Sequence, residues 1–193
     1  LISALSDRKK LAALAKAHPA RAIISIPPDM AFGTGHHATT ATVLRLLVDF
    51  ARSREGRPWT LCDLGTGSGV LAIAAAKLGA KEVRGCDFDP HAVRVALRNL
   101  RRNRVRGVRI EEADVLRWKT GPRHDVVTAN LFSDVLIAAF PRIARAVKPG
   151  GRVLVSGILK SQAAACLRAG EEAGFKFDTV IARGKWVTAR GVR

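Results

Sequence analysis

The sequence has few of the features that hold small extracellular or membrane proteins together. It contains three cysteines, an odd number without a Cys-x-x-Cys pair, which indicates buried, reduced thiols (Cys62, Cys86 and Cys166) rather than a disulfide framework. No apolar run approaches the ~20 residues that a membrane-spanning helix needs, and the charged segment 1–16 does not resemble a signal peptide. These absences predict a globular, cytoplasmic protein with no membrane partner.

Acidic residues are scarce. The 33 basic residues outnumber 16 acidic ones and give a net charge of +17, which favours acidic partners such as nucleic acid or ribonucleoprotein. Segment 94–109 is the most basic, and no acid occurs from 94 to 110; its arginines are Arg94, Arg98, Arg101, Arg102, Arg104, Arg106 and Arg109. A contact with ribosomal RNA is one interpretation of this segment, and a solvated face in an Arg-rich proteome is the other. No aromatic residue interleaves with these arginines, so a stacking platform for single-stranded bases is not supported.

A length of 193 residues suits one domain with a sizeable core. We expect residues 22–193 to form that domain, and residues 1–21 to be an amphipathic helix (1–17) or the remnant of a linker. Because the chain starts with Leu1 rather than Met, it could be a processed or truncated piece.

Strand and helix patterns alternate along the chain, which predicts an α/β fold with a mainly parallel, doubly wound sheet. The expected strands are 22–26, 61–64, 82–87, 108–110, 125–130 and 152–156, followed by a closing hairpin, 175–182 and 186–189, that makes one strand antiparallel. The expected helices are 39–52 with a Thr39 or Thr40 cap, 70–78, 90–103 starting at Pro90, 135–147 interrupted by Pro141, and 161–173 capped by Ser161. Residues 148–151 are expected to form a turn.

The stretch between 60 and 90 carries the main motif, Asp63-x-Gly65-x-Gly67-x-Gly69, between a strand and a helix. A dinucleotide-binding turn would need glycine or alanine at position 70, where Val70 stands. The leading carboxylate would repel a pyrophosphate but would suit a ligand with an ammonium and a sulfonium, such as S-adenosylmethionine. Asp87 ends the next strand at the distance expected for a carboxylate that accepts from ribose hydroxyls. The alternative is a glycine turn that only lets the helix pack on the strand.

The segment from 30 to 40 combines glycines, hydroxyls, two histidines and Phe32 before a predicted helix. Paired histidines suggest a metal, but no Cys, Asp or Glu lies at ligand spacing, and adjacent side chains point in different directions. We therefore expect no metal site, and a loop that lines a cofactor pocket through Phe32 and Thr40.

Several motifs resemble the PrmA family, the ribosomal protein L-eleven lysine methyltransferases. They are AFGTG-x-H-x-TT at 31–40, DLGTGSGVLAIAA at 63–75, GCDFDP at 85–90, ANL at 129–131, and LVSGILKSQ at 154–162. The likeness covers about residues 28 to 190, although His36 and Ala38 stand where the family usually has Thr and Pro. It implies a Rossmann-like class I methyltransferase fold with seven strands.

The resemblance also implies a function: methyl transfer from S-adenosylmethionine, giving S-adenosylhomocysteine, to a lysine or α-amino group of a protein, with a ribosomal protein as acceptor. In similar enzymes an acid at the position of Asp114 faces adenine; a helix cap is the other interpretation. We expect the cofactor to be bound by Phe32, Thr40, Asp63, Gly65, Gly67, Gly69, Asp87, Asp114 and Asn130.

Two residues are candidates for the transfer itself. Asn130 would orient the acceptor amine, and His37 would either bond the acceptor or brace the loop. Enzymes that methylate the amino groups of nucleobases carry Pro-Pro after this Asn or Asp, and Leu131-Phe132 does not match them. Another acceptor, RNA or a small molecule, and a cofactor-binding module without turnover remain as alternatives.

Overall fold

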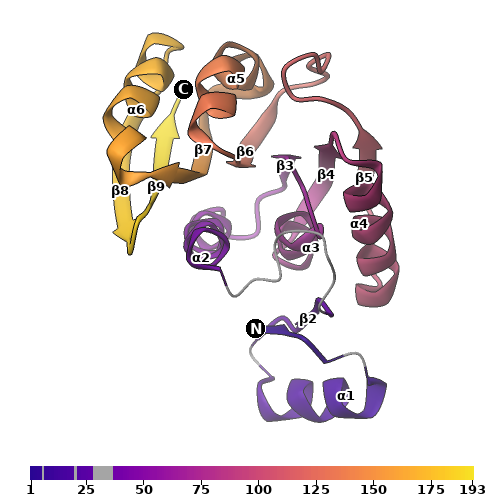
Figure 1. Cartoon of the computed structure of the whole chain (residues 1–193). Helices are drawn as coiled ribbons and strands as arrows, with labels where there is room; N and C mark the ends of the chain where they lie inside the picture. Colours follow the sequence, from indigo (N-terminus) through magenta and orange to yellow (C-terminus); the bar gives the residue numbers. More distant parts are fainter. Residues whose placement is uncertain (6, 20, 28–36) are drawn as a thin grey trace.

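The structure, a computed structural model, describes all residues except 6, 20 and 28–36. Its main sheet consists of β3 (Trp59–Leu64), β4 (Ala80–Asp87), β5 (Val108–Glu112), β6 (His124–Asn130), β7 (Val147–Leu159), β8 (Lys176–Arg183) and β9 (Trp186–Val192). These seven strands are arranged in the order β5-β4-β3-β6-β7-β9-β8 (Figure 1). The pairs of β9 with β7 and with β8 are antiparallel and the other four pairs are parallel, so β9 is the one reversed strand of this sheet. The predicted mainly parallel sheet with one antiparallel strand is confirmed.

Helices cover both faces of this sheet. Side chains of α2 (Ala38–Ser53), α3 (Val70–Lys77) and α4 (Pro90–Asn103) pack into one apolar cluster, and those of α5 (Ser133–Ala146) and α6 (Ala163–Glu172) into another. Strand β3 alternates between them, because Leu61 faces the first cluster while Cys62 and Leu64 face the second. The three cysteines are buried free thiols, as predicted. Within the described residues, no helix combines the length and apolar character needed to cross a bilayer.

The N-terminal segment differs from the expected single helix. Strand β1 (Ile2–Ser3) pairs in parallel with β2 (Ile24–Ser25) in a separate two-stranded sheet, and α1 (Arg8–Ala17) begins only after Asp7. Asp7 caps α1 by accepting from the Lys10 amide at 2.9 Å. Asn103 joins β2 to the end of α4, because its side chain exchanges two 2.8 Å hydrogen bonds with the Ser25 main chain. The expected strand 22–26 therefore lies outside the main sheet.

Four further local predictions were wrong. Helix α5 continues through Pro141, which is exposed, so water can reach the carbonyl that loses its partner. Residues 148–151 belong to β7 instead of a separate turn. Ser161 lies in a short 3₁₀ helix, Lys160–Gln162, that precedes α6. Thr39 and Thr40 lie inside the first turn of α2, where His37 takes the cap position.

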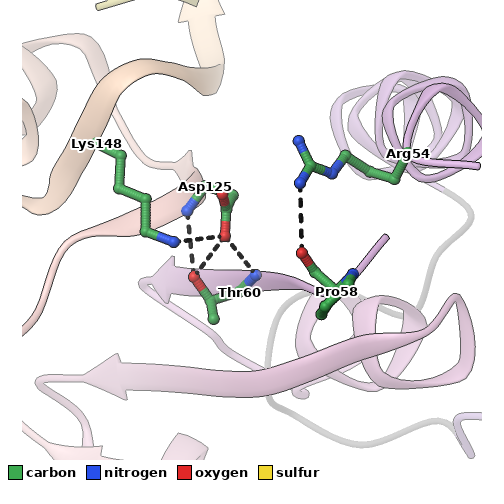
Figure 2. A network of polar contacts seen from close by, with 5 residues as sticks. All are labelled: Arg54, Pro58, Thr60, Asp125 and Lys148. Atoms are coloured by element: carbon green, nitrogen blue, oxygen red, sulfur yellow. Dashed lines mark hydrogen bonds and ion pairs between the residues drawn. The ribbon is translucent and has the colours of Figure 1, made fainter. Parts of the chain in front are cut away.

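A polar network joins three strands at the edge where β6 begins (Figure 2). The Asp125 carboxylate accepts from the Thr60 amide, the Thr60 hydroxyl and Lys148 Nζ, each at 2.9 Å. Burial opposes ionisation of Asp125, but the hydrogen bonds from Lys148 and Thr60 outweigh it and hold the pKa of this carboxyl below its usual value. Since β6 begins here, the network lies at the opposite edge from the ends of the parallel strands.

We expect Asp125→Asn to lower the free energy of unfolding by about 1–2 kcal/mol at pH 7, because the charged hydrogen bonds at a side chain only 19% exposed are lost. A depressed pKa stabilises the fold above the unfolded value and loses that effect as the pH falls through the folded value, so the gap should stay constant from pH 7 to about pH 5 and narrow below about pH 4. Urea unfolding across this range measures it. Asp49→Asn, on the exposed side of α2, is the control and should change little. A gap that is the same at pH 2.5 and pH 7 would contradict the proposed linkage.

Candidate functional site

The carboxyl ends of β3, β4, β5 and β6 meet at one edge of the sheet. The chain proceeds from β3 to β4 and β5 on one side, then returns to β6 on the other side of β3. Ligands of open α/β sheets bind outside such a switch point. Asp63, Asp87 and Asn130 lie at the ends of β3, β4 and β6, and Asp114 follows the end of β5. The structure thus brings these predicted residues to one edge.

The glycine turn is fixed by the end of β4. The amides of Gly65 and Thr66 both donate to the Cys86 carbonyl at 2.9 Å, and the Gly67 amide donates to Asp87 Oδ2 at 2.8 Å. Gly65, Gly67 and Gly69 all have positive φ, which side chains disfavour. A Cβ on Gly65 would also collide with Leu131 Cδ2, so the turn lies directly against the segment after β6.

Asp87 is placed to bind a ligand as well as to hold this turn. It is 8% exposed, and its Oδ1 accepts from the Asp89 amide at 3.1 Å. Each carboxylate oxygen has two acceptor sites, so hydroxyls can still bind beside the Gly67 and Asp89 amides. The ribose contact of Asp87 stays a prediction.

Asp63 is more deeply buried than its predicted contact with the cofactor requires. It is 1% exposed, and its two oxygens accept from the Thr66 and Thr128 hydroxyls, both at 2.7 Å. The pKa of Asp63 is raised from 3.8 to about 6, because burial and, to a smaller extent, the charge of Asp87 outweigh the two threonine hydrogen bonds that lower it. Because Asp63 is almost completely buried, it can influence a ligand through its charge but offers no exposed oxygen for a hydrogen bond.

Asn130 connects β6 to the start of α2. Its Nδ2 donates to the Thr39 hydroxyl at 3.3 Å and to the Thr40 hydroxyl at 3.4 Å. These bonds orient the amide so that Oδ1 points toward Gly157 of β7, where a Cβ would lie 3.2 Å from it. The predicted residues Thr40 and Asn130 thus touch each other, with Thr40 almost fully buried.

His37 extends this contact toward the terminal hairpin. Its Nδ1 lies 2.8 Å from the Thr39 hydroxyl, and its ring meets the Trp186 ring edge-on with centroids 5.4 Å apart. The ammonium of Lys185 lies over the Trp186 ring, 5.3 Å from its centroid. These contacts favour bracing over direct contact with an acceptor, the two roles left open by the sequence.

Asp114 stands at an open hollow beyond β5. The hollow is lined by Glu111, Glu112, Ala113, Asp114, Arg117, Trp118 and Lys119. Asp114 Oδ1 accepts from the Leu116 amide at 2.9 Å, which makes it the cap of a turn rather than of a helix. Its exposed carboxylate can still reach a ligand in the hollow, so the predicted contact with adenine stays a prediction.

One predicted site residue lies outside the described part of the chain, and the sequence analysis missed two residues that hold the site together. Phe32 lies outside the described residues, so its position is left open. The described residues contain no group of three His, Cys, Asp or Glu side chains that could hold a metal. The missed residues are Thr128, which bonds Asp63, and Asn99, whose side chain donates to the Ser68 carbonyl at 2.9 Å and fastens the turn to α4.

Cysteine chemistry is not available at this edge. Cys86 follows Gly85 in the motif that contains Asp87, but it is buried. Burial raises the pKa of Cys86 to about 12, so its thiol stays protonated at neutral pH and is not a nucleophile.

The strand order, the glycine turn and the acid that ends β4 define a Rossmann-like fold of the class I methyltransferase type. The N-methyltransferase NodS of Bradyrhizobium japonicum, solved with S-adenosyl-L-homocysteine, shares this fold with a TM-score of 0.60 at 15% identity, covering 82% of this chain and 89% of NodS. Residues 9–193 match the sequence profile described as "Ribosomal protein L11 methyltransferase (PrmA)". The chain belongs to this family, as the motifs predicted.

Individual relatives agree with the family assignment. The chain is 44% identical to the ribosomal protein L11 methyltransferase of Pelotomaculum thermopropionicum over 166 residues, 86% of this chain and 52% of the relative. It is also 44% identical to that of Thermus thermophilus over 162 residues, 84% and 61% of the two chains. The crystal structure of ribosomal protein L11 methylase from Lactobacillus delbrueckii subsp. bulgaricus matches with a TM-score of 0.79 at 30% identity, covering 89% and 85%. The chain spans about half to three fifths of the length of the two curated relatives.

Proposed function

We propose that the chain transfers a methyl group from S-adenosylmethionine to amino groups of a ribosomal protein, with the protein L11 that its relatives' names give as the acceptor. The observation that carries the proposal is the position of Asp87 and Asn130 on either side of the glycine turn. A cytoplasmic location belongs to the same proposal, since the acceptor and three reduced, buried thiols suit that compartment.

The residues present fit a cationic nucleoside. The turn has no side chain at Gly65, so the backbone can approach a ligand closely. Asp87 has acceptor capacity for two ribose hydroxyls. Asp63 and Asp87 make the potential under the turn more negative, and the charge of Asp87 disfavours ionisation of Asp63. A ligand with an ammonium and a sulfonium would relieve that repulsion, whereas a pyrophosphate would add to it.

The bound cofactor would supply an activated methyl group that an amine can displace from sulfur. The amine must first lose a proton, and for a lysine with a pKa of ~10.4 this costs roughly 4.6 kcal/mol at pH 7. Asn130 Oδ1 can accept from the remaining N–H groups and aim the lone pair, because Thr39 and Thr40 hold the amide. Positioning of this kind supplies much of the rate in a displacement between two bound partners. The proton can leave to water, so the chain needs no dedicated base.

Phe132 offers an apolar wall for the acceptor. It follows Asn130 by two residues, stands at the start of α5 and is 69% exposed. The aliphatic stem of an incoming lysine could pack on its ring, which would exclude water near the amine and lower the cost of deprotonation.

We expect Asp87→Ala to weaken binding of S-adenosylmethionine at least tenfold, because both the ribose contact and the bond to the Gly67 amide are lost. Asp87→Asn should lose less, since its amide oxygen can still accept from that amide. Isothermal titration calorimetry measures both. An Asp87→Ala variant that binds as tightly as the wild type would disprove the assignment of the ribose site.

The function itself is tested with radiolabelled S-adenosylmethionine, purified ribosomal protein L11 and, separately, whole ribosomes and cell extract. We expect label on the protein and methyl-lysine or a methylated α-amine by mass spectrometry. Label on RNA or on a small molecule would favour those acceptors, and cofactor binding without label in any fraction would mean a binding module.

A further inference from the structure

We propose that the exposed arginines of α4, of the loop to β5 and of the start of β5 bind the phosphate backbone of RNA. This surface, the arginine face, consists of Arg94, Arg101, Arg102, Arg104, Arg106 and Arg109, all exposed. The choice of RNA over DNA rests on the proposed function, because a ribosomal acceptor is presented beside RNA.

The arginine face carries a positive charge that neighbouring acids offset only in part, since Glu82 interacts electrostatically with Arg109. None of its six arginines forms an ion pair with any residue that the structure describes. Among the described contacts, Arg101 alone of the six has a side-chain hydrogen bond, from Nε to the Leu97 carbonyl at 3.3 Å. Some other arginines are paired, as Arg152 and Arg190 are with Asp178. The arginine face therefore leaves its guanidinium groups available to an external anion.

The helix geometry aligns part of this charge. Arg94 and Arg101 lie seven residues apart, which is nearly two turns and about 10 Å along the axis of α4. Arg102 flanks them, and the remaining three continue through the end of the helix toward β5. An extended row of charges suits a polymer with a regular series of anions better than a single small anion. Guanidinium groups also match phosphate oxygens in a two-bond geometry that ammonium groups cannot supply.

The remainder of α4 excludes a membrane as the partner. An interfacial helix must insert an apolar face into the lipid. Among the apolar residues of α4, Ala92, Val95, Ala96 and Leu100 are buried, and Val93 and Leu97 are partly buried, so the helix exposes no fully apolar face. The arginine face contains no exposed aromatic residue that could stack on a base, so binding should follow phosphate charge and not base sequence.

The site and the arginine face are joined through α4. Asp89 caps this helix by accepting from the His91 amide at 2.7 Å, and its own amide donates to Asp87. Asn99, in the middle of α4, fastens the glycine turn. RNA on the arginine face would therefore lie on the helix that supports the proposed cofactor site, and could hold a ribosomal acceptor near it.

The test uses the full chain and fluorescein-labelled 20-nucleotide probes, single-stranded RNA and duplex DNA, in polarisation titrations from 50 to 300 mM KCl. The test variant is Arg94→Gln/Arg101→Gln/Arg102→Gln. The matched control is Arg145→Gln/Arg168→Gln/Lys176→Gln, which removes the same charge from exposed positions on α5, α6 and β8. Thermal unfolding and cofactor titration establish that all three proteins are folded.

We expect the wild type to bind RNA, and the test variant to bind at least tenfold more weakly at 50 mM KCl. The slope of log affinity against log salt should fall by about two units, since each lost phosphate contact on a single strand contributes ~0.7. The control should stay within threefold of the wild type. Equal losses in both variants, binding of DNA alone, or no binding by the wild type would overturn the inference.

Methyl transfer to free protein L11 is measured in parallel. The test variant should retain it, because its three arginines lie outside the proposed cofactor and acceptor contacts. RNA binding without methyl transfer would contradict the proposed function only, and methyl transfer without RNA binding would contradict this inference only.

Discussion

Gly157→Ala is expected to lower the rate of methyl transfer at least a hundredfold while the variant still binds S-adenosylmethionine. Gly157 has a φ of +83°, and an added Cβ would collide with the Leu131 carbonyl oxygen and lie 3.2 Å from Asn130 Oδ1. Both oxygens belong to the segment proposed to hold the acceptor amine. Displacing them by about 1 Å is enough for a loss of roughly 10²-fold in a reaction that depends on positioning. Saturation kinetics should place the loss mainly in kcat.

Gly150→Ala is the matched control. Gly150 has a similar φ of +72°, but an added Cβ would have no described atom within 4 Å. It carries the same backbone strain, about 1–2 kcal/mol, without the collision. We expect near wild-type rates from this variant, with a lowered melting temperature. Equal rates for the two variants would show that Gly157 has no part in positioning the acceptor.

The second large effect is expected for Asp63→Asn, which should stabilise the free protein at pH 8 and weaken cofactor binding. The rise in the pKa of Asp63 from 3.8 to about 6 corresponds to roughly 3 kcal/mol lost on ionisation. Replacing a charged hydrogen bond by a neutral one costs about 1 kcal/mol. The free energy of unfolding should therefore rise by ~2 kcal/mol. The affinity for S-adenosylmethionine should fall at least tenfold, because the buried negative charge that favours a cationic ligand is gone.

The pH dependence of the stability difference between Asp63→Asn and the wild type tests the ionisation of Asp63. A carboxyl with a raised pKa stabilises the folded state fully below the unfolded value and loses this stabilisation as the pH rises through the folded value. The gain of Asp63→Asn over the wild type should therefore grow from pH 4 to pH 6 and then level off. Urea unfolding at several pH values, with Asp49→Asn as control, measures it. A variant that is less stable than the wild type at pH 8 but not at pH 4 would contradict the assigned ionisation.

Much of the sheet could be predicted because its strands are short apolar runs bounded by glycine and acids. The position of Asp87 at the end of β4 could be predicted too, since its separation from the glycine turn in the sequence reflects the geometry of one βαβ unit. The contact between Asp63 and Thr128 could not, because 65 residues separate them and only strand pairing between β3 and β6 brings them together. For the same reason the sequence overstated the direct access of Asp63 to a ligand.

Gly157 could have been found. An isolated glycine inside a strand pattern often marks a close approach of another backbone, and Leu131 makes that approach here. The start of α1 was harder to predict, because the apolar spacing typical of a helix continues before Asp7. The pairing of Ile2 and Ser3 with β2 keeps these residues out of the helix. The cap of α2 was misplaced because Thr39 and Thr40 look like capping residues, whereas their hydroxyls bond Asn130.

A crystal structure with S-adenosylmethionine tests the central claim most directly. We predict that the glycine turn holds the cofactor with both ribose hydroxyls on the Asp87 carboxylate and the methyl group directed toward Asn130. A cofactor bound elsewhere, or a turn that binds a nicotinamide or flavin nucleotide in its place, would contradict the account.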